Sequence, residues 1–222
     1  MSTSQSPEDL ARLKAVVTSH AGDWLHAPPL TAVGLRLSDE AIRVAIGYRL
    51  GTNICQPHTC ACGSTVDARV LHGLACRKSG PCHIRHSQLS DLIWQAVKKA
   101  QIPASKEPIG LSRANGKRPD GATLVSWTRG KPLAWNVTVP DTYAASHLQL
   151  ISTTACAAAE KAAVNKSTKY VAIAATHSFV PVAIETVPGA NSQRNSSKIL
   201  EDGSRRLPTS RSRRHICTRG GR

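Results

Sequence analysis

Residues 121–139, GATLVSWTRGKPLAWNVTV, decide the fold of this chain. The two halves of the stretch, 121–127 and 132–139, are rich in residues that strands favour, and a polar turn separates them. In the second half, Leu133, Trp135, Val137 and Val139 alternate with Ala134, Asn136 and Thr138. This alternation predicts a strand with two different faces, so that Trp135 and Asn136 point to opposite sides.

Helical and strand patterns surround this stretch. The apolar spacing predicts four helices, over residues 10–17, 38–50, 87–100 and 152–169. Further strands are expected over residues 108–113, 170–176 and 179–187. The order from the third helix onward is helix, three strands, helix, two strands, which indicates an α/β fold with a mixed sheet flanked by helices.

The chain of 222 residues is strongly basic, with a formal net charge of +15 at pH 7. Residues 189–222 hold eight Arg and one Lys against Glu201 and Asp202, a net +7, so the body is basic without them. This charge favours a polyanionic partner, DNA first and RNA second. No apolar run approaches the ~20 residues of a membrane span. We therefore expect an intracellular, nuclear protein without a membrane partner.

A cluster of cysteine and histidine precedes the predicted strands. Cys60 and Cys62 lie close together, and His72 and Cys76 follow with three residues between them. Three thiolates and one imidazole at this spacing can converge on a tetrahedral Zn²⁺. A site with four protein ligands is closed, so the sequence predicts a structural zinc site of the zinc-knuckle type.

Two alternatives to this ligand set stay open. The cysteines could be buried as small apolar side chains that bind no metal. A neighbouring side chain could also replace one of the four ligands. The candidates for such a replacement are Cys55, His58, Cys82, His83 and His86.

A second motif, Lys117-Arg118-Pro119-Asp120-Gly121, falls at the start of the first predicted strand. Metal-dependent cleavage of a phosphodiester uses carboxylates to hold Mg²⁺ or Mn²⁺, which activates water and neutralises charge on the phosphate. Asp120 can supply one carboxylate. The next strand offers Asn136, a neutral amide, where a second acid would complete the site.

The ordered series of motifs resembles the C-terminal region of non-LTR retrotransposon reverse transcriptases, in which a zinc knuckle precedes a restriction-like endonuclease. The resemblance extends over about residues 22–187. It rests on the cysteine and histidine cluster and on five further motifs. These are Arg85-His86, Glu107-Pro108-Ile109-Gly110-Leu111, Lys117-Arg118-Pro119-Asp120-Gly121, Trp135-Asn136-Val137-Thr138-Val139 and Lys166-Ser167-Thr168-Lys169-Tyr170.

The resemblance implies a fold of the PD-(D/E)xK type, in which a mixed sheet is flanked by helices. It also implies a metal-dependent nick in target DNA that primes reverse transcription. The expected segments are an N-terminal helical lead over 1–50, a zinc knuckle over 51–86, an endonuclease-like domain over 87–187 and a basic, disordered tail over 188–222.

The resemblance also assigns roles to single residues by position. Asp120 would be the first metal-binding carboxylate, and Asn136 stands where the family has its second acid. The basic residue of this fold class often follows that acid by two positions, where this chain has Thr138. A lysine on the last helix, Lys166 or Lys169, would take over its role. Glu107 would be an additional acid.

Asn136 leaves three functions open. An amide in place of a carboxylate lowers metal affinity and stabilisation of the transition state together, so an endonuclease would be impaired. The alternatives are a zinc-containing nucleic-acid-binding module without catalysis and an inactive remnant of a retroelement. The nuclease hypothesis requires that Asp120, Asn136 and one of the two lysines converge at one edge of the sheet.

Overall fold

The computed structural model describes residues 6–19, 21–33, 36–76, 78, 81–112 and 116–187. A four-stranded sheet with the order β3-β4-β5-β6 forms its centre. The strands are β3 (Ala104–Lys106), β4 (Gly121–Thr128), β5 (Lys131–Thr138) and β6 (Ser178–Ala183). The first three are antiparallel neighbours, whereas β5 and β6 pair in parallel. The predicted mixed sheet is therefore confirmed.

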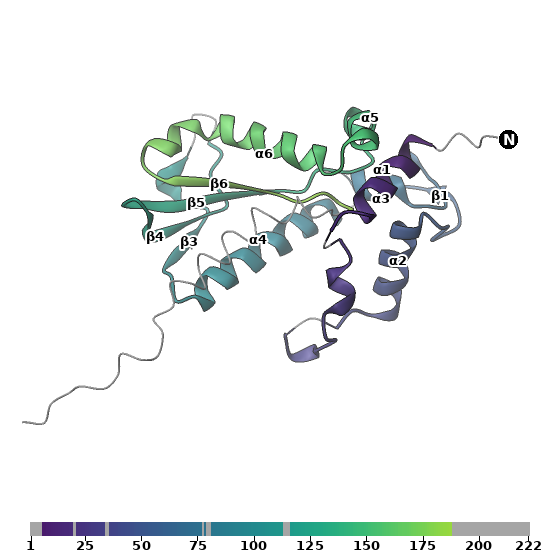
Figure 1. The fold of residues 1–222 in the computed structure, drawn as a ribbon, viewed down its shortest axis with the longest axis horizontal. Helices are drawn as coiled ribbons and strands as arrows, with labels where there is room; N and C mark the ends of the chain where they lie inside the picture. The colour runs from purple at the N-terminus through teal and green to yellow at the C-terminus, as the bar shows by residue number, and fades with distance from the viewer. Residues whose placement is uncertain are drawn as a thin grey trace, which may run out of the picture.

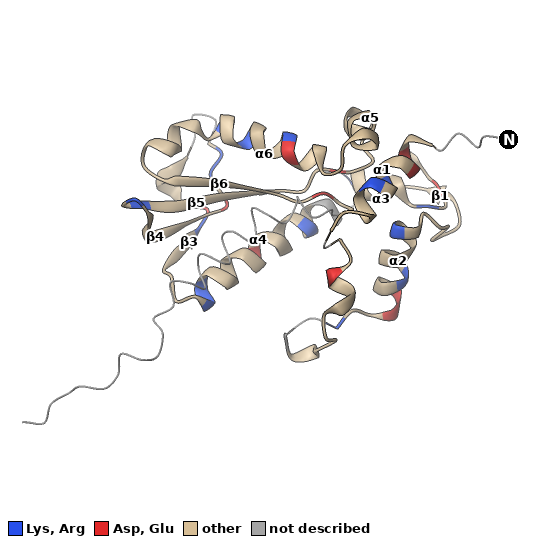
Figure 2. Cartoon of the chain, in the orientation of Figure 1, with Lys and Arg blue, Asp and Glu red and all other residues tan. Residues whose placement is uncertain are grey.

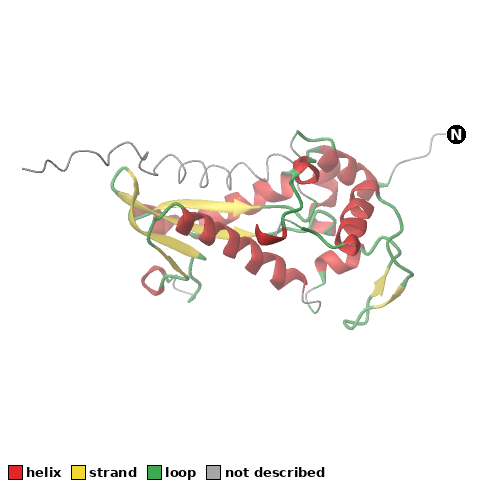
Figure 3. Cartoon of the chain, turned by 90° about the horizontal axis from the view of Figure 1, so that it is seen from below, coloured by secondary structure: helices red, strands yellow, loops and turns green. Residues whose placement is uncertain are grey.

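Helices lie on both faces of this sheet (Figure 1). One face packs against α4 (Pro81–Lys99), which runs along the strands, as the view in Figure 3 also shows. The other face packs against the end of α6 (Ala157–Lys169) and the 3₁₀ helix η4 (Val171–Ala175). The molecule is thus an α/β structure with a mixed sheet of four strands between helices.

The alternation along β5 divides the core between these two faces. Trp135 is fully buried in the cluster that includes Ile93 of α4. Ala134, one residue earlier, packs in a different cluster with Tyr170 at the end of α6. Because successive side chains of a strand point to opposite faces, Asn136 shares the face of Ala134 and lies on the α6 side.

Two of the predicted strands are wrong. Within residues 108–113, the 3₁₀ helix η3 (Ile109–Leu111) follows Pro108, which has no amide hydrogen for a strand ladder. The edge strand β3 lies just before it. Residues 170–176 form η4, because the N–H of Tyr170 still bonds to the carbonyl of Lys166 and continues the turn of α6.

The predicted Ala-rich helix over residues 152–169 is two helices, α5 (Ala145–Thr153) and α6. The chain breaks between them at Cys156, whose φ of 64° is left-handed. The buried carboxylate of Glu185 then accepts a hydrogen bond of 3.0 Å from the N–H of Ala159, one of the donors that a helix start leaves unpaired. The helix predicted over 87–100 also begins earlier, at Pro81.

The two helices predicted near the N-terminus are present. The first is α1 (Pro7–Val16), which packs Ala11 against Ile151 of α5. The second is α2 (Asp39–Leu50), capped by Ser38 and ended by Gly51 with a φ of 71°. Two 3₁₀ helices, η1 (Asp23–His26) and η2 (Thr31–Val33), lie between them.

The cysteine and histidine region forms a small hairpin and a short helix. The hairpin pairs β1 (His58–Thr59) with β2 (Thr65–Val66), and α3 (Leu71–Ala75) follows. This hairpin lies at the opposite end of the molecule from the β4–β5 turn (Figures 1 and 3). The tail predicted over 188–222 falls outside the described residues. Among the described helices, none has the length and apolar character needed to cross a bilayer.

Candidate functional site

Cys60, Cys62, His72 and Cys76 meet in one cluster. The first two lie on the β1–β2 turn, where Gly63 has a φ of 92° that few other residues adopt. The other two lie in α3 and directly after it. The four ligand atoms all lie within 4.8 Å of one another, so the hairpin and the helix present one Cys3His set.

The spacing within the cluster fits a tetrahedral ion. The Sγ atoms of Cys60 and Cys76 lie 3.7 Å apart. Two sulfurs bound to one zinc at about 2.3 Å would lie about 3.8 Å apart at the tetrahedral angle. The Sγ of Cys62 lies 3.2 Å from Nε2 of His72. The cluster could therefore hold a metal ion such as zinc.

Within the cluster, protonation favours metal binding at Cys62 but opposes it at His72 and Cys60, whose pKa values are raised. Hydrogen bonds from the side chain and backbone of Ser64 lower the pKa of the Cys62 thiol to about 6. A hydrogen bond to Cys62 in turn raises the pKa of His72. Because only a thiolate binds the metal, a cysteine that is ionised near neutral pH binds without a large proton cost.

Among the described side chains, the alternatives to this ligand set do not fit the structure. Cys60 and Cys62 are only partly buried, unlike cysteines that serve as small apolar core residues. The Sγ of Cys55 and the Nδ1 of His58 lie 3.9 Å from each other, and neither residue is a member of the cluster. His86 points to Asp120 instead. The side chain of Cys82 is outside the described part of the chain.

A second polar group lines a cavity of about 340 Å³ where β4 begins. This cavity brings together Asp120, which directly precedes β4, Asn136 of β5 and Lys166 of α6, whereas Lys169 is not among its lining residues. The full lining is His86, Glu107, Gly116, Lys117, Arg118, Asp120, Asn136, Lys166 and Tyr170. Asp120, Asn136 and Lys166 therefore line one cavity together, whereas their role in cleavage stays a prediction.

The carboxylate of Asp120 is held from two sides. Its Oδ2 accepts a hydrogen bond from the N–H of Val137 and lies 3.5 Å from Nε2 of His86. The contact with Asp120 raises the pKa of His86, even though partial burial of the ring acts in the other direction. Asp120 therefore already has one N–H donor and one ionisable partner within the protein.

Asn136 is almost fully buried, with 4% of its surface exposed. Its side-chain Oδ1 is buried and has no hydrogen-bond partner among the described residues. A buried polar atom without a partner costs about 1–3 kcal/mol. Asn136 thus presents an unsatisfied amide in a cavity, which is the arrangement expected where a ligand supplies the missing partner.

Basic side chains dominate the rest of the cavity. Arg118 lies 3.5 Å from Glu107, so this acid is paired with a cation. The hydroxyl of Tyr170 donates to the carbonyl of Arg118 at 2.8 Å and fixes the backbone there. With Lys117, Lys166 and the imidazole of His86, four basic side chains face two carboxylates. This donor set fits a divalent cation poorly, because one carboxylate and a neutral amide are surrounded by positive charge.

His86 and Tyr170 line the cavity, and the sequence patterns did not predict this position for either of them. His86 was expected as an alternative zinc ligand, since the cysteine cluster is close to it in sequence. Tyr170 was expected in a strand. Both belong to motifs on which the resemblance rests, and that membership was the available signal.

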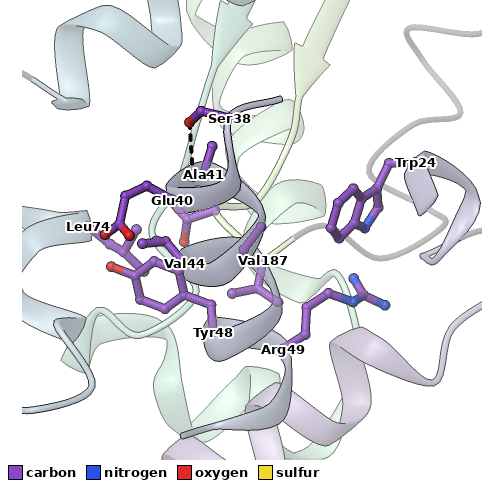
Figure 4. A pocket seen from close by; sticks show the side chains of 11 residues that line it. Trp24, Ser38, Glu40, Ala41, Val44, Tyr48, Arg49, Leu74 and Val187 are labelled. Carbon is purple, nitrogen blue, oxygen red and sulfur yellow. Dashed lines mark hydrogen bonds between the residues drawn. The ribbon is translucent and has the colours of Figure 1, made fainter. Parts of the chain in front are cut away.

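A larger cavity, of about 670 Å³, lies over α2. Figure 4 shows its wall formed by Val44 and Tyr48 of α2, with Trp24 on one side and Leu74 on the other. Its polar lining includes Glu40, which pairs with Arg43 at 2.6 Å. This cavity is mainly apolar, and it contains none of the predicted site residues.

No protein-family model matches the sequence, and no curated protein is significantly similar to it.

Proposed function

We propose that this chain is a DNA-binding, endonuclease-like domain derived from a retrotransposon reverse transcriptase, and that its cleavage of DNA is impaired by Asn136. The observation that carries the proposal is the meeting of Asp120, Asn136 and Lys166 in one cavity at the start of β4. The Cys3His cluster supports it, because a zinc knuckle before this domain belongs to the same resemblance.

The distribution of charge supports binding to nucleic acid. Lysine and arginine residues lie on α6, at the β4–β5 turn and at the end of α4 (Figure 2). The β4–β5 turn lies at the opposite end of β4 from the cavity, so a bound strand that reached both would meet positive charge along the sheet. Binding to genomic DNA would place the protein in the nucleus.

The cavity explains why cleavage would be weak. With an acid at position 136, two carboxylates would face the same space and could share Mg²⁺ or Mn²⁺, and the ion would activate a water. Asn136 brings an oxygen but no charge. Removing a single electrostatic stabiliser from a catalytic site typically costs about 10²–10³ in rate. In this proposal Lys166 would stabilise the charge on the phosphate.

A supercoiled-plasmid nicking assay tests the proposal. We expect little or no nicking by the native chain with Mg²⁺ or Mn²⁺, and nicking by Asn136→Asp. The matched control is Asp120→Asn combined with Asn136→Asp, which keeps the charge of the native cavity and should stay inactive. An Asn136→Asp protein that folds and binds the plasmid but does not nick it would overturn the nuclease ancestry.

The second candidate is a zinc-containing nucleic-acid-binding module without any catalytic role. The excess of basic side chains in the cavity favours it. This function predicts DNA or RNA binding that weakens steeply with salt. The absence of binding at about 50 mM salt, where electrostatic binding is strong, would exclude both candidates.

A further inference from the structure

We propose that the cavity lined by His86, Arg118 and Lys166 binds a phosphate group of a nucleic-acid strand directly, with no divalent ion between them. This inference rests on the proposed binding of nucleic acid, and it names the part of the ligand that this cavity holds. The cavity would then bind an anion at the position where the resemblance implies a bound Mg²⁺ or Mn²⁺.

The charges of the cavity are the first support. Four basic side chains face two carboxylates, and each carboxylate already has a basic partner. Oε2 of Glu107 lies 3.5 Å from Nη2 of Arg118, and Oδ2 of Asp120 lies 3.5 Å from Nε2 of His86. Both acids thus have a basic neighbour, and the lining also includes Lys117 and Lys166, each of which has an interaction within the protein. An oxyanion is the ligand that this balance attracts.

Asn136 is the residue that changes the preferred ligand of the cavity from a divalent cation to a phosphate. An ionised aspartate can only accept hydrogen bonds and would repel a phosphate, whereas an asparagine amide can present either its oxygen or its N–H donors. Asn136 lines the cavity, and its buried Oδ1 has no hydrogen-bond partner among the described residues. An asparagine at this position can donate to a phosphate oxygen, which an ionised aspartate could not.

The size of the cavity fits this ligand. A volume of about 340 Å³ is at the lower end of the range of small-molecule pockets. It can admit one phosphate with part of its nucleotide. We therefore expect the site to hold one backbone phosphate of a bound strand.

Fluorescence anisotropy with a labelled single-stranded 12-mer tests the inference in buffer without magnesium. Each phosphate contact on a single strand contributes about 0.7 to the slope of log affinity against log salt. Lys166→Gln should lower that slope by about 0.7, and Lys166→Arg should restore it. Lys161→Gln is the matched control, because Lys161 lies on the same helix, is exposed, and does not line the cavity. Thermal melting checks that each variant is folded.

Two additions identify the ligand. Inorganic phosphate should displace the strand from the native chain more strongly than chloride of equal ionic strength, and Lys166→Gln should reduce this difference. Millimolar Mg²⁺ should weaken binding to the native chain, because it competes for the phosphate, but should strengthen binding to Asn136→Asp.

Equal slopes for Lys166→Gln and Lys161→Gln would overturn the phosphate site while leaving nucleic-acid binding intact. Stronger binding of the native chain with Mg²⁺ would overturn it too, since a bridging ion would then be present. Failure of the native chain to bind any strand would instead contradict the proposed function, and the phosphate site with it.

Discussion

Nε2 of His86 lies 3.5 Å from Oδ2 of Asp120, and this contact connects the two candidate sites of the chain. The preceding residue, Arg85, donates a hydrogen bond of 2.5 Å to the carbonyl of Leu74 in α3. That short helix also carries His72 of the metal cluster. In the first turns of α4, Arg85 therefore contacts the helix that carries part of the cysteine cluster, and the next residue, His86, contacts Asp120 in the cavity.

The pair of His86 and Asp120 should make stability depend on pH. The contact raises the pKa of His86 above its ordinary value of 6.5, while Lys166 opposes the shift. A raised pKa in the folded state means that the pair stabilises the protein below pH 6.5, and that this contribution is lost as the pH rises through the folded-state pKa. Because the His86 side chain is 42% exposed, we expect at most about 1 kcal/mol.

Urea unfolding at about pH 5.5 and about pH 8.5, either side of the histidine range, measures this contribution. His86→Gln should destabilise the protein at the lower pH and have less effect at the higher one. His83→Gln is the control, because His83 is exposed on the same helix. An equal effect of His86→Gln at both pH values would show that the ion pair contributes nothing.

Metal content should follow the Cys3His cluster. We expect one zinc per chain by elemental analysis, and its loss in Cys62→Ser together with a lower melting temperature, since metal binding and folding are coupled. Cys55→Ser should keep the zinc, because Cys55 is near the cluster but not a member of it. A native chain without zinc and without cooperative unfolding would instead support the inactive remnant.

Gly121 should be intolerant of a side chain. It pairs with Trp135 across β4 and β5, and a Cβ placed on Gly121 would lie only 2.1 Å from Cζ2 of that ring. Trp135 is fully buried and cannot move aside, so Gly121→Ala should lower the free energy of unfolding by about 1–3 kcal/mol. Gly110→Ala is the control, because nothing lies within 4 Å of its Cβ. Equal urea midpoints for both variants would show that β4 and β5 can accommodate a Cβ at Gly121 without loss of stability.

Local patterns predicted the parts of this fold that local contacts determine. The β4–β5 hairpin follows from the alternation around Trp135, and α2 follows from the cap at Ser38. The strand predicted at 170–176 failed because the end of α6 continues as a 3₁₀ turn, which no strand propensity reports. The position of His86 depends on how α4 packs on the sheet, and the sequence near His86 suggested the metal cluster instead.

The final prediction concerns magnesium and stability, and it requires no cleavage. Asn136→Asp places a second carboxylate on the α6 face near Asp120, in a buried position where two like charges repel. Without a divalent ion this variant should be less stable than the native chain. Mg²⁺ should restore its stability, by about 1.4 kcal/mol at a tenfold excess over the dissociation constant, because the ion binds only the folded state. The native chain, with one acid at the site, should show no such gain.

Melting curves with and without Mg²⁺ at constant ionic strength make the comparison. A gain of the same size in the native chain would mean that Asn136 with Asp120 already holds the ion, and the cavity would then be a metal site in spite of its positive surroundings.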